Sequence, residues 1–307
     1  MRKSTPMPHW IMRNKRANSP IFVLDGPWNP EVLLRGECIM VKVDCPEAID
    51  YISRLVSSPT KIEGFIWEDK NASIESININ PEWGKIPVIL RIGRIGRFAE
   101  VSNKLKIIRS LGIKVLLYAN SPTTYRDIQI LASLGISTGL YFEEDMPVSE
   151  GIKDLVAYAF YSPIDHGVIE PFHTMELLYC GENYVSPKDA SYDDSPRYIH
   201  INEKLEMAVS AKNLKEGNFI GKGQQVLYDI FHSNEKKQTE WQNFFIQSHP
   251  CSFCPAFRVC MGFFSEANCD ESHKSLMMDI LAGIEHTKQI KNSRDHGNHN
   301  IQGDRSL

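Results

Sequence analysis

Four of the seven cysteines lie close together near the end of the chain, at Cys251, Cys254, Cys260 and Cys269. A C-x2-C turn directs two thiolates to the same side, and two further sulfurs nearby complete a four-sulfur site. This pattern predicts a metal ion or an iron–sulfur cluster bound by the four thiolates. A disulfide pair or unpaired thiols are the alternatives.

The spacing of these cysteines separates the candidate metals only in part. Zinc ribbons and fingers usually carry two C-x2-C-like turns separated by a longer loop, whereas this chain carries one such turn and two later single cysteines. The C-x2-C-x5-C pattern, followed by Met261-Gly-Phe-Phe264, resembles the SPASM domain at the end of many radical SAM peptide-modifying enzymes. In that family the pattern supplies ligands to an auxiliary [4Fe–4S] cluster.

The residues upstream of the cysteines agree with this resemblance, which covers about residues 195–275. Residues 198–210 read as a β-hairpin, and residues 213–221 look like the loop in which SPASM domains carry an Ile-Gly-Asn-like turn. A helical stretch over residues 224–247 leads into the cysteines.

The chain also departs from the complete SPASM pattern. Val209 and Ser210 stand where the family has a cysteine at the end of a hairpin strand, and Phe264 stands where a later cysteine is expected. The stretch before the C-x2-C turn holds no cysteine back to Cys180. The resemblance therefore implies one surviving cluster site with Cys269 as its fourth ligand. Weaker substitutes for that ligand are Asp270, His273 and His249.

Radical SAM enzymes also need C-x3-C-x2-C after the first barrel strand, where three thiolates leave one iron open for S-adenosylmethionine. That spacing is absent: after Cys45, the next two ligand positions hold Ile49 and Ile52, which cannot bind iron. Cys45 is either a vestige of the motif or an ordinary buried thiol at a strand end. The chain thus resembles a radical SAM and SPASM scaffold without the radical-generating cluster, and we expect it not to use S-adenosylmethionine.

The middle of the chain alternates between strand and helix patterns. Helical spacing covers residues 98–110 and ends at Gly112, and Ser-Leu-Gly-Ile occurs at 110–113 and again at 133–136. Such repeated strand–helix units make a parallel sheet with right-handed crossovers. The expected strands are residues 38–43, 61–67, 86–92, 114–118 and the Leu-Tyr pair at 140–141.

These patterns predict an α/β protein with two parts. Residues 36–190 are expected to form a partial, open TIM-like barrel, since a closed one needs about 250 residues. Residues 195–287 are expected to form a small, truncated, cysteine-rich SPASM-like α+β module. The basic residues 1–18 and the polar residues 288–307 are expected to be disordered tails.

Composition narrows the function classes. A net charge of −4 gives no reason to expect nucleic-acid or membrane binding, and no apolar run reaches the roughly 18 residues that span a bilayer. No secretory signal follows the basic N-terminus. Seven cysteines without secretion indicate reduced thiols and a cytoplasmic protein.

Two further groups of side chains are candidate binding residues. Arg91, Arg94 and Arg97 surround two glycines at the end of an expected strand, where α/β sheets bind ligands. This loop predicts a site for an anion, a peptide carboxylate or a partner protein, with a solvated loop as the alternative. Glu68 and Glu143 end two strands, either as exposed residues or in a functional cavity. No nucleophile with a recognisable signature accompanies them, so no catalytic residue is expected.

The sequence leaves three functions open. The resemblance implies an accessory, non-catalytic protein with one [4Fe–4S] cluster that works with an active radical SAM enzyme, or its precursor peptide, in modifying a ribosomally made peptide. The second possibility is an iron–sulfur redox enzyme or electron-transfer subunit. The third is a peptide- or protein-binding protein in which the four cysteines hold structural zinc.

Overall fold

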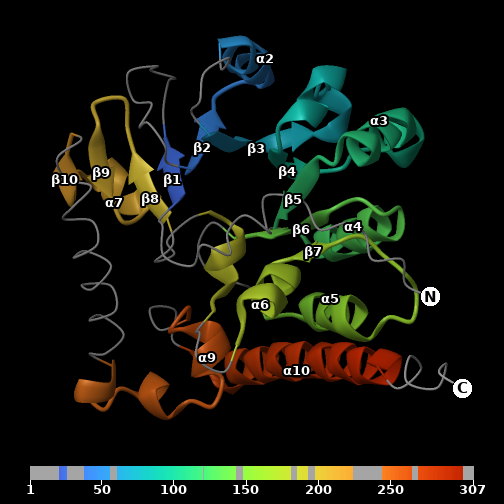
Figure 1. Cartoon of the computed structure of the whole chain (residues 1–307), viewed down its shortest axis with the longest axis vertical. Helices are drawn as coiled ribbons and strands as arrows, with labels where there is room; N and C mark the ends of the chain where they lie inside the picture. The colour runs from blue at the N-terminus through green and yellow to red at the C-terminus, as the bar shows by residue number, and fades with distance from the viewer. Residues whose placement is uncertain are drawn as a thin grey trace, which may run out of the picture.

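The strands of this protein form one open sheet (Figure 1). The computed structural model describes residues 21–25, 38–55, 61–119, 121–142, 148–180, 185–192, 198–223, 244–264 and 269–299. The strands are β1 (Ile21–Leu24), β2 (Cys38–Val43), β3 (Lys61–Ser73), β4 (Val88–Arg94), β5 (Lys114–Tyr118), β6 (Thr138–Tyr141), β7 (Ile169–Glu170), β8 (Tyr198–Ile201), β9 (Glu206–Ala208) and β10 (Gly221–Lys222). Their order across the sheet is β10-β9-β8-β1-β2-β3-β4-β5-β6-β7.

Strands β1 to β7 are parallel and follow one another in sequence order, and β8 pairs in parallel with the other side of β1. Strand β9 pairs antiparallel with β8 on one side and with β10 on the other, so among the described strands β9 alone runs against the rest. The α/β class predicted from the sequence is confirmed. The sheet does not close on itself, because its outer strands are β10 and β7.

Helices connect most of the parallel strands. They are α2 (Pro46–Leu55), α3 (Phe98–Leu111), α4 (Pro122–Ser133), α5 (Glu150–Tyr161), α6 (Phe172–Leu178), α7 (Ala211–Glu216), α9 (Phe257–Cys260) and α10 (Glu271–His299). Short 3-10 turns are η2 (Ile74–Ser76), η3 (Pro81–Lys85), η4 (Pro187–Ala190) and η6 (Pro250–Phe253). Local sequence explains their limits: Gly112 ends α3 in the left-handed region at φ 69°, and Ser121 caps α4 just before Pro122.

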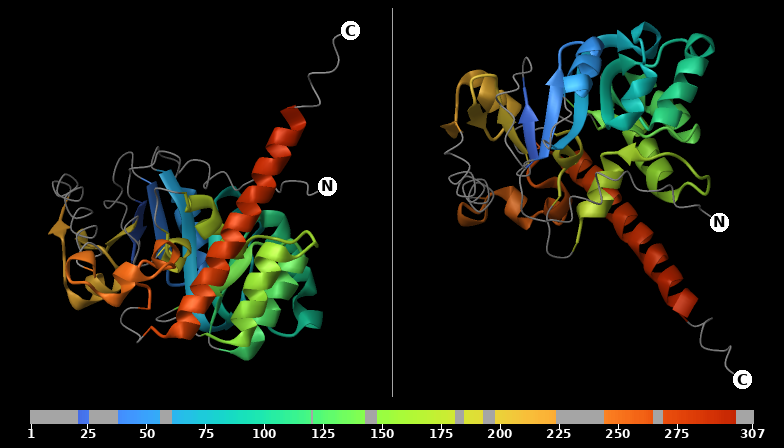
Figure 2. Two further views of the ribbon diagram at one scale, coloured as in Figure 1. Left: turned by 90° about the horizontal axis from the view of Figure 1, so that it is seen from below. Right: turned by 45° about the horizontal axis from the view of Figure 1, so that its top comes forward.

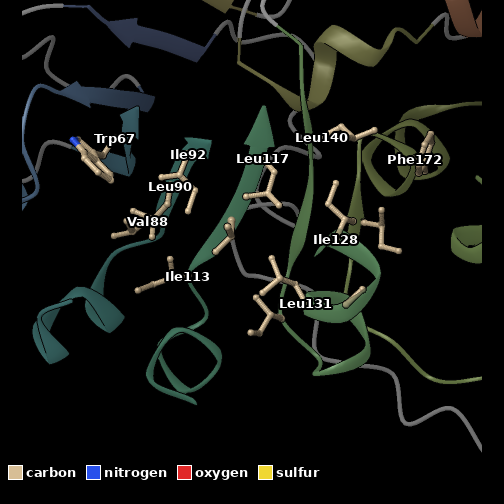
Figure 3. Close-up of a cluster of buried hydrophobic side chains, with 14 of the residues drawn as sticks. Trp67, Val88, Leu90, Ile92, Ile113, Leu117, Ile128, Leu131, Leu140 and Phe172 are labelled. Carbon is tan, nitrogen blue, oxygen red and sulfur yellow. The ribbon is translucent and has the colours of Figure 1, made fainter. Parts of the chain in front are cut away.

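Alternate residues of each strand face opposite sides of the sheet. On one side, Val88, Leu90 and Ile92 of β4 pack with the apolar faces of α3 and α4 in the main core (Figure 3). The other side, which we call the inner face, carries a second buried cluster. Its strand residues are Val23, Met40, Ile66, Ile89, Leu116, Tyr118, Tyr141 and Tyr198.

Strand β1 was not predicted from the sequence, and it joins the strands of the two expected domains into one sheet. It pairs with β2 on one side and with β8 on the other, so the sheet runs without a break from the expected barrel into the expected C-terminal module. The hairpin expected at residues 198–210 is confirmed as β8 and β9. The predicted helix at 224–247 and the tail 1–18 lie largely or wholly outside the described residues.

Part of the expected C-terminal tail, residues 288–299, belongs to a helix in the structure. Helix α10 continues to His299 and extends beyond the rest of the fold (Figure 2). Lys288 donates to the carbonyl oxygen of Tyr179, and Lys291 pairs with Glu176 on α6. These contacts anchor a polar segment whose composition alone suggested disorder.

Candidate metal centre

The C-x2-C turn is built by η6. The ring of His249 accepts a hydrogen bond from the backbone N–H of Cys251 at 3.2 Å, and the N–H of Cys254 donates to the carbonyl oxygen of Cys251 at 3.2 Å. Both thiols are partly buried. This local hydrogen bonding brings the first two cysteines into one turn, as the spacing predicted.

Cys260 sits in a different environment, at the end of α9. Met261 and Gly262 follow it in the left-handed region, at φ 50° and 76°, so the chain turns back over the thiol. Burial raises the pKa of Cys260 to about 11, against the opposing effect of backbone hydrogen bonds from Phe264, Phe263 and Gly262. Successive N–H groups aimed at one atom make a nest that favours a negative charge.

Cys269 immediately precedes α10. Asp270 caps this helix, accepting hydrogen bonds from the N–H groups of Ser272 at 2.9 Å and His273 at 3.1 Å. Burial raises the pKa of Cys269, and the nearby Cys254 thiol raises it further. The structure therefore brings Cys269 into electrostatic range of the C-x2-C turn.

The four thiols are neighbours without being arranged as a finished site. Burial raises the pKa of Cys251, and the Cys269 and Cys254 thiols raise it further. Even so, within the described ranges no group of three or more His, Cys, Asp or Glu residues is arranged to hold a metal ion. Thiolates repel one another without a cation between them, so a bound metal would be needed to draw these four to ligand distance. The donor set, four thiols with one in an N–H nest, fits a zinc ion or an iron–sulfur cluster.

Core residues occupy two of the positions at which a radical SAM motif would carry cysteines. Cys45 is exposed between β2 and α2, so the alternative of a buried thiol was wrong. Ile49 and Ile52 are about 1% exposed and belong to the main core. The two positions that would ligate iron in a radical SAM motif are thus used to pack α2 against the sheet.

The candidate pair Glu68 and Arg91 is brought together, while the arginine loop is not. Arg91 is fully buried on the inner face and donates to Glu68 at 2.7 Å, and its guanidinium lies 4.3 Å from the ring centroid of Tyr141. Arg94 belongs to the alternate, opposite set of β4 residues and is exposed. Exposed Arg97 pairs with Glu100 at 2.5 Å. Glu143 lies outside the described residues.

The glycines between these arginines have a packing role. A Cβ on Gly93 would lie 2.1 Å from the carbonyl oxygen of Lys70, so glycine permits the close approach of β3 and β4. Gly96, at φ 87°, packs against Glu75, which accepts a hydrogen bond from the N–H of Arg97. The loop is shaped by strand packing, which leaves Arg94 and Arg97 as surface charges.

Sequence reasoning missed a group of inner-face charges. Asp25 at the end of β1 accepts from Lys42 at 2.7 Å and contacts His200 at 2.5 Å. Nε2 of the fully buried His200 has no hydrogen-bond partner in the described part of the chain. Towards the other edge of the sheet, buried Lys114 of β5 pairs with buried Glu170 of β7 at 2.6 Å. A four-residue strand such as β1 carries too few residues for periodicity to reveal it.

Six cysteines are free thiols: Cys45, Cys180, Cys251, Cys254, Cys260 and Cys269. Among the described helices, none combines the length and the apolar character needed to cross a membrane. Comparison of the chain with protein-family models, with curated proteins and with solved structures found no match.

Proposed function

We propose that this protein is a catalytically silent relative of radical SAM and SPASM proteins that holds one [4Fe–4S] cluster. Cys251, Cys254, Cys260 and Cys269 would be its ligands. In this proposal it works in the cytoplasm beside an active radical SAM enzyme, as an accessory component in the modification of a ribosomally made peptide.

The observation that carries the proposal is the environment of Cys260. A buried thiol among apolar side chains normally stays protonated, and burial does raise the pKa of Cys260. Three backbone N–H groups nevertheless act in favour of its thiolate. Hydrogen bonds to cluster sulfurs are one means by which proteins tune iron–sulfur centres. When bound, the cluster would supply one-electron redox capacity or cross-link the C-terminal segment.

The sheet supports a radical-SAM-like scaffold. Parallel strands in sequence order with helices on one side are the winding of a (β/α) barrel, whereas doubly wound sheets reverse their strand order. We infer that β1 to β7 form a partial, open barrel and that β8 to β10 with residues 244–269 form a reduced SPASM-like module. The redox-enzyme alternative gains less support, because its proposed cavity residue Arg91 is buried in an ion pair with Glu68.

Metal analysis of anaerobically purified protein tests the cluster. We expect about four irons and four sulfides per chain, as for one four-cysteine cluster. Cys260→Ser should lose most of the iron, while Cys45→Ser, at an exposed thiol outside the site, should keep it. Stoichiometric zinc without sulfide would replace the cluster by a structural zinc site, which the same donors also fit. A wild-type protein that binds neither metal would overturn both forms of the proposal.

The proposal that the protein does not cleave S-adenosylmethionine has its own test. Because the chain has no C-x3-C-x2-C, incubation with dithionite and S-adenosylmethionine should yield no 5′-deoxyadenosine above a cysteine-free control. Production of 5′-deoxyadenosine would show that the inner face supports radical chemistry after all.

The proposed partner surface includes the exposed Arg94 and Arg97, because guanidinium groups bind carboxylates on peptides or proteins. Arg94→Glu with Arg97→Glu should weaken co-purification with an active radical SAM enzyme or its precursor peptide without lowering cluster content. Lys106→Glu with Arg109→Glu on α3 gives a matched control of equal charge change. Equal loss in both double variants would assign the effect to net charge.

A further inference from the structure

Residues 185–192 run from the main core, where Val185 is buried, to the inner face of the sheet, where Tyr192 is buried. Helices α2 to α5 pack against the other face, so an open sheet of this kind needs something else to cover its apolar inner side. Tyr192 meets that need: it is 4% exposed, belongs to the inner-face cluster, and packs its ring 5.1 Å from that of Tyr198. Its φ of 55° is unusual for a tyrosine, which shows that packing determines its conformation.

Polar contacts also hold this segment in place. Arg91, oriented by Glu68, donates a hydrogen bond to the carbonyl oxygen of Ser191. The hydroxyl of Tyr198 donates to the carbonyl oxygen of Asp189 at 2.7 Å. Inner-face side chains therefore bind the main chain of residues 185–192 much as they would bind a peptide.

The same segment contacts the cysteine region. The N–H of Val185 donates to the carbonyl oxygen of Arg258 at 2.9 Å, and the ammonium of Lys188 lies 5.6 Å from the ring centroid of Phe263. Arg258 and Phe263 flank Cys260, and the N–H of Phe263 donates to the carbonyl oxygen of Cys260 at 2.9 Å. One short stretch of chain thus connects a proposed metal ligand with the inner face.

We propose that metal bound at the four cysteines fastens residues 185–192 across the inner face, and that metal loss releases them. This inference rests on the proposed function. Metal binding would fix the turn around Cys260, and with it the carbonyl group and the ring that hold Val185 and Lys188. Release would leave the hydrogen-bond donors of Arg91 and Tyr198 available to bind the main chain of another peptide. Such linkage is reciprocal, so loosening the segment must weaken metal retention by the same factor.

The test is amide hydrogen exchange on the full-length protein, metal-loaded and after anaerobic chelation, with metal content measured in parallel. Exchange in residues 185–192 should accelerate at least about fivefold on metal removal, the lower end of ordinary coupling. Exchange in α4 should stay unchanged as the internal control. A protein that loses its metal while residues 185–192 keep their exchange rate would overturn the inference and leave the metal site standing. A protein that never binds metal would overturn both.

A second variant tests the same coupling without metal removal, in case metal removal unfolds the whole chain. Val185→Pro removes the N–H that donates to the carbonyl oxygen of Arg258, and it leaves every cysteine unchanged. In the metal-loaded protein it should accelerate exchange in residues 185–192 and lower the chelator concentration that strips half the metal, each at least about fivefold. Arg258→Ala is the matched control, because it keeps the carbonyl group and alters only an exposed side chain. Unchanged metal retention in Val185→Pro would contradict the coupling.

Discussion

Nδ1 of His200 lies 2.5 Å from Oδ2 of Asp25, and this contact joins residues 175 positions apart in the sequence. It links β8, the first strand of the C-terminal hairpin, to β1, the first strand of the parallel series. Lys42 of β2 forms an ion pair with the same carboxylate at 2.7 Å. The seam between the two expected domains is therefore held by these polar side-chain contacts as well as by the strand pairing.

Asp25→Asn should lower the free energy of unfolding in a pH-dependent way. Burial alone would raise the pKa of Asp25, but the hydrogen bond from His200 and the charge of Lys42 lower it to about 2. Since the folded pKa lies below the unfolded one, the stabilisation is complete above about pH 4 and lost as pH falls towards 2. The loss should be on the order of 2 kcal/mol at pH 7, measured by urea unfolding.

Asp279→Asn, on the exposed side of α10, is the control for this change and should unfold like the wild type. The difference between Asp25→Asn and wild type should shrink between pH 4 and pH 2.5. A difference that stays constant over that interval would show that the carboxylate charge is not what stabilises the seam.

Glu170→Gln should destabilise the protein far more than the same change in an exposed pair. Lys114 and Glu170 have side chains only 6% and 0% exposed, and removing one charge of a buried pair costs about 3–5 kcal/mol. Glu150→Gln, which breaks the exposed pair with Lys153, should cost less than about 1 kcal/mol. Thermal and denaturant unfolding of both variants give the comparison, and similar losses would refute the assignment of a buried ion pair.

Gly283→Ala should destabilise the docking of α10. Alanine in a helix is normally about 1 kcal/mol better than glycine, but a Cβ here would lie 2.3 Å from the ring of Phe160 on α5. Phe160 is itself buried and its centroid lies 5.9 Å from that of Phe172, so it has little room to move. The clash should outweigh the propensity gain. Glu285→Ala on the exposed side of α10 is the control, and an increased melting temperature of Gly283→Ala would contradict this packing.

Cys254→Ser should make residues 248–275 sensitive to protease in the metal-loaded preparation, while the parallel strands stay intact. Metal sites of this kind contribute folding energy, about 10 kcal/mol or more in zinc-finger peptides, and the local turns here are short. Limited proteolysis with mass spectrometry identifies the cleaved segment. Cys180→Ser, at an exposed thiol outside the cysteine run, should give the wild-type pattern. Identical proteolysis of both variants would argue against a structural metal centre.

Local pattern was enough to predict the elements that strongly periodic segments form. Residues 114–118 form a buried strand, and the apolar spacing of Val101, Leu105 and Ile108 does mark the buried face of α3. The hairpin at β8 and β9 also followed from sequence, because turn residues and alternation are local signals. The cysteine spacing likewise pointed to one turn that gathers thiols, independently of the rest of the chain.

Tertiary structure decided what depends on contacts between distant residues. Strand β1 exists because β2 and β8 pair with it, and residues 288–299 stay helical alongside contacts that α10 makes with α6. The three arginines do not form one site, because alternate side chains of a strand lie on opposite faces of the sheet. Arg91 is buried in an ion pair with Glu68, whereas the other two are exposed. The covering of the inner face by Tyr192 needed the same information. Sequence periodicity reports which residues prefer burial, whereas the partner that buries each one is determined only when the whole chain has folded.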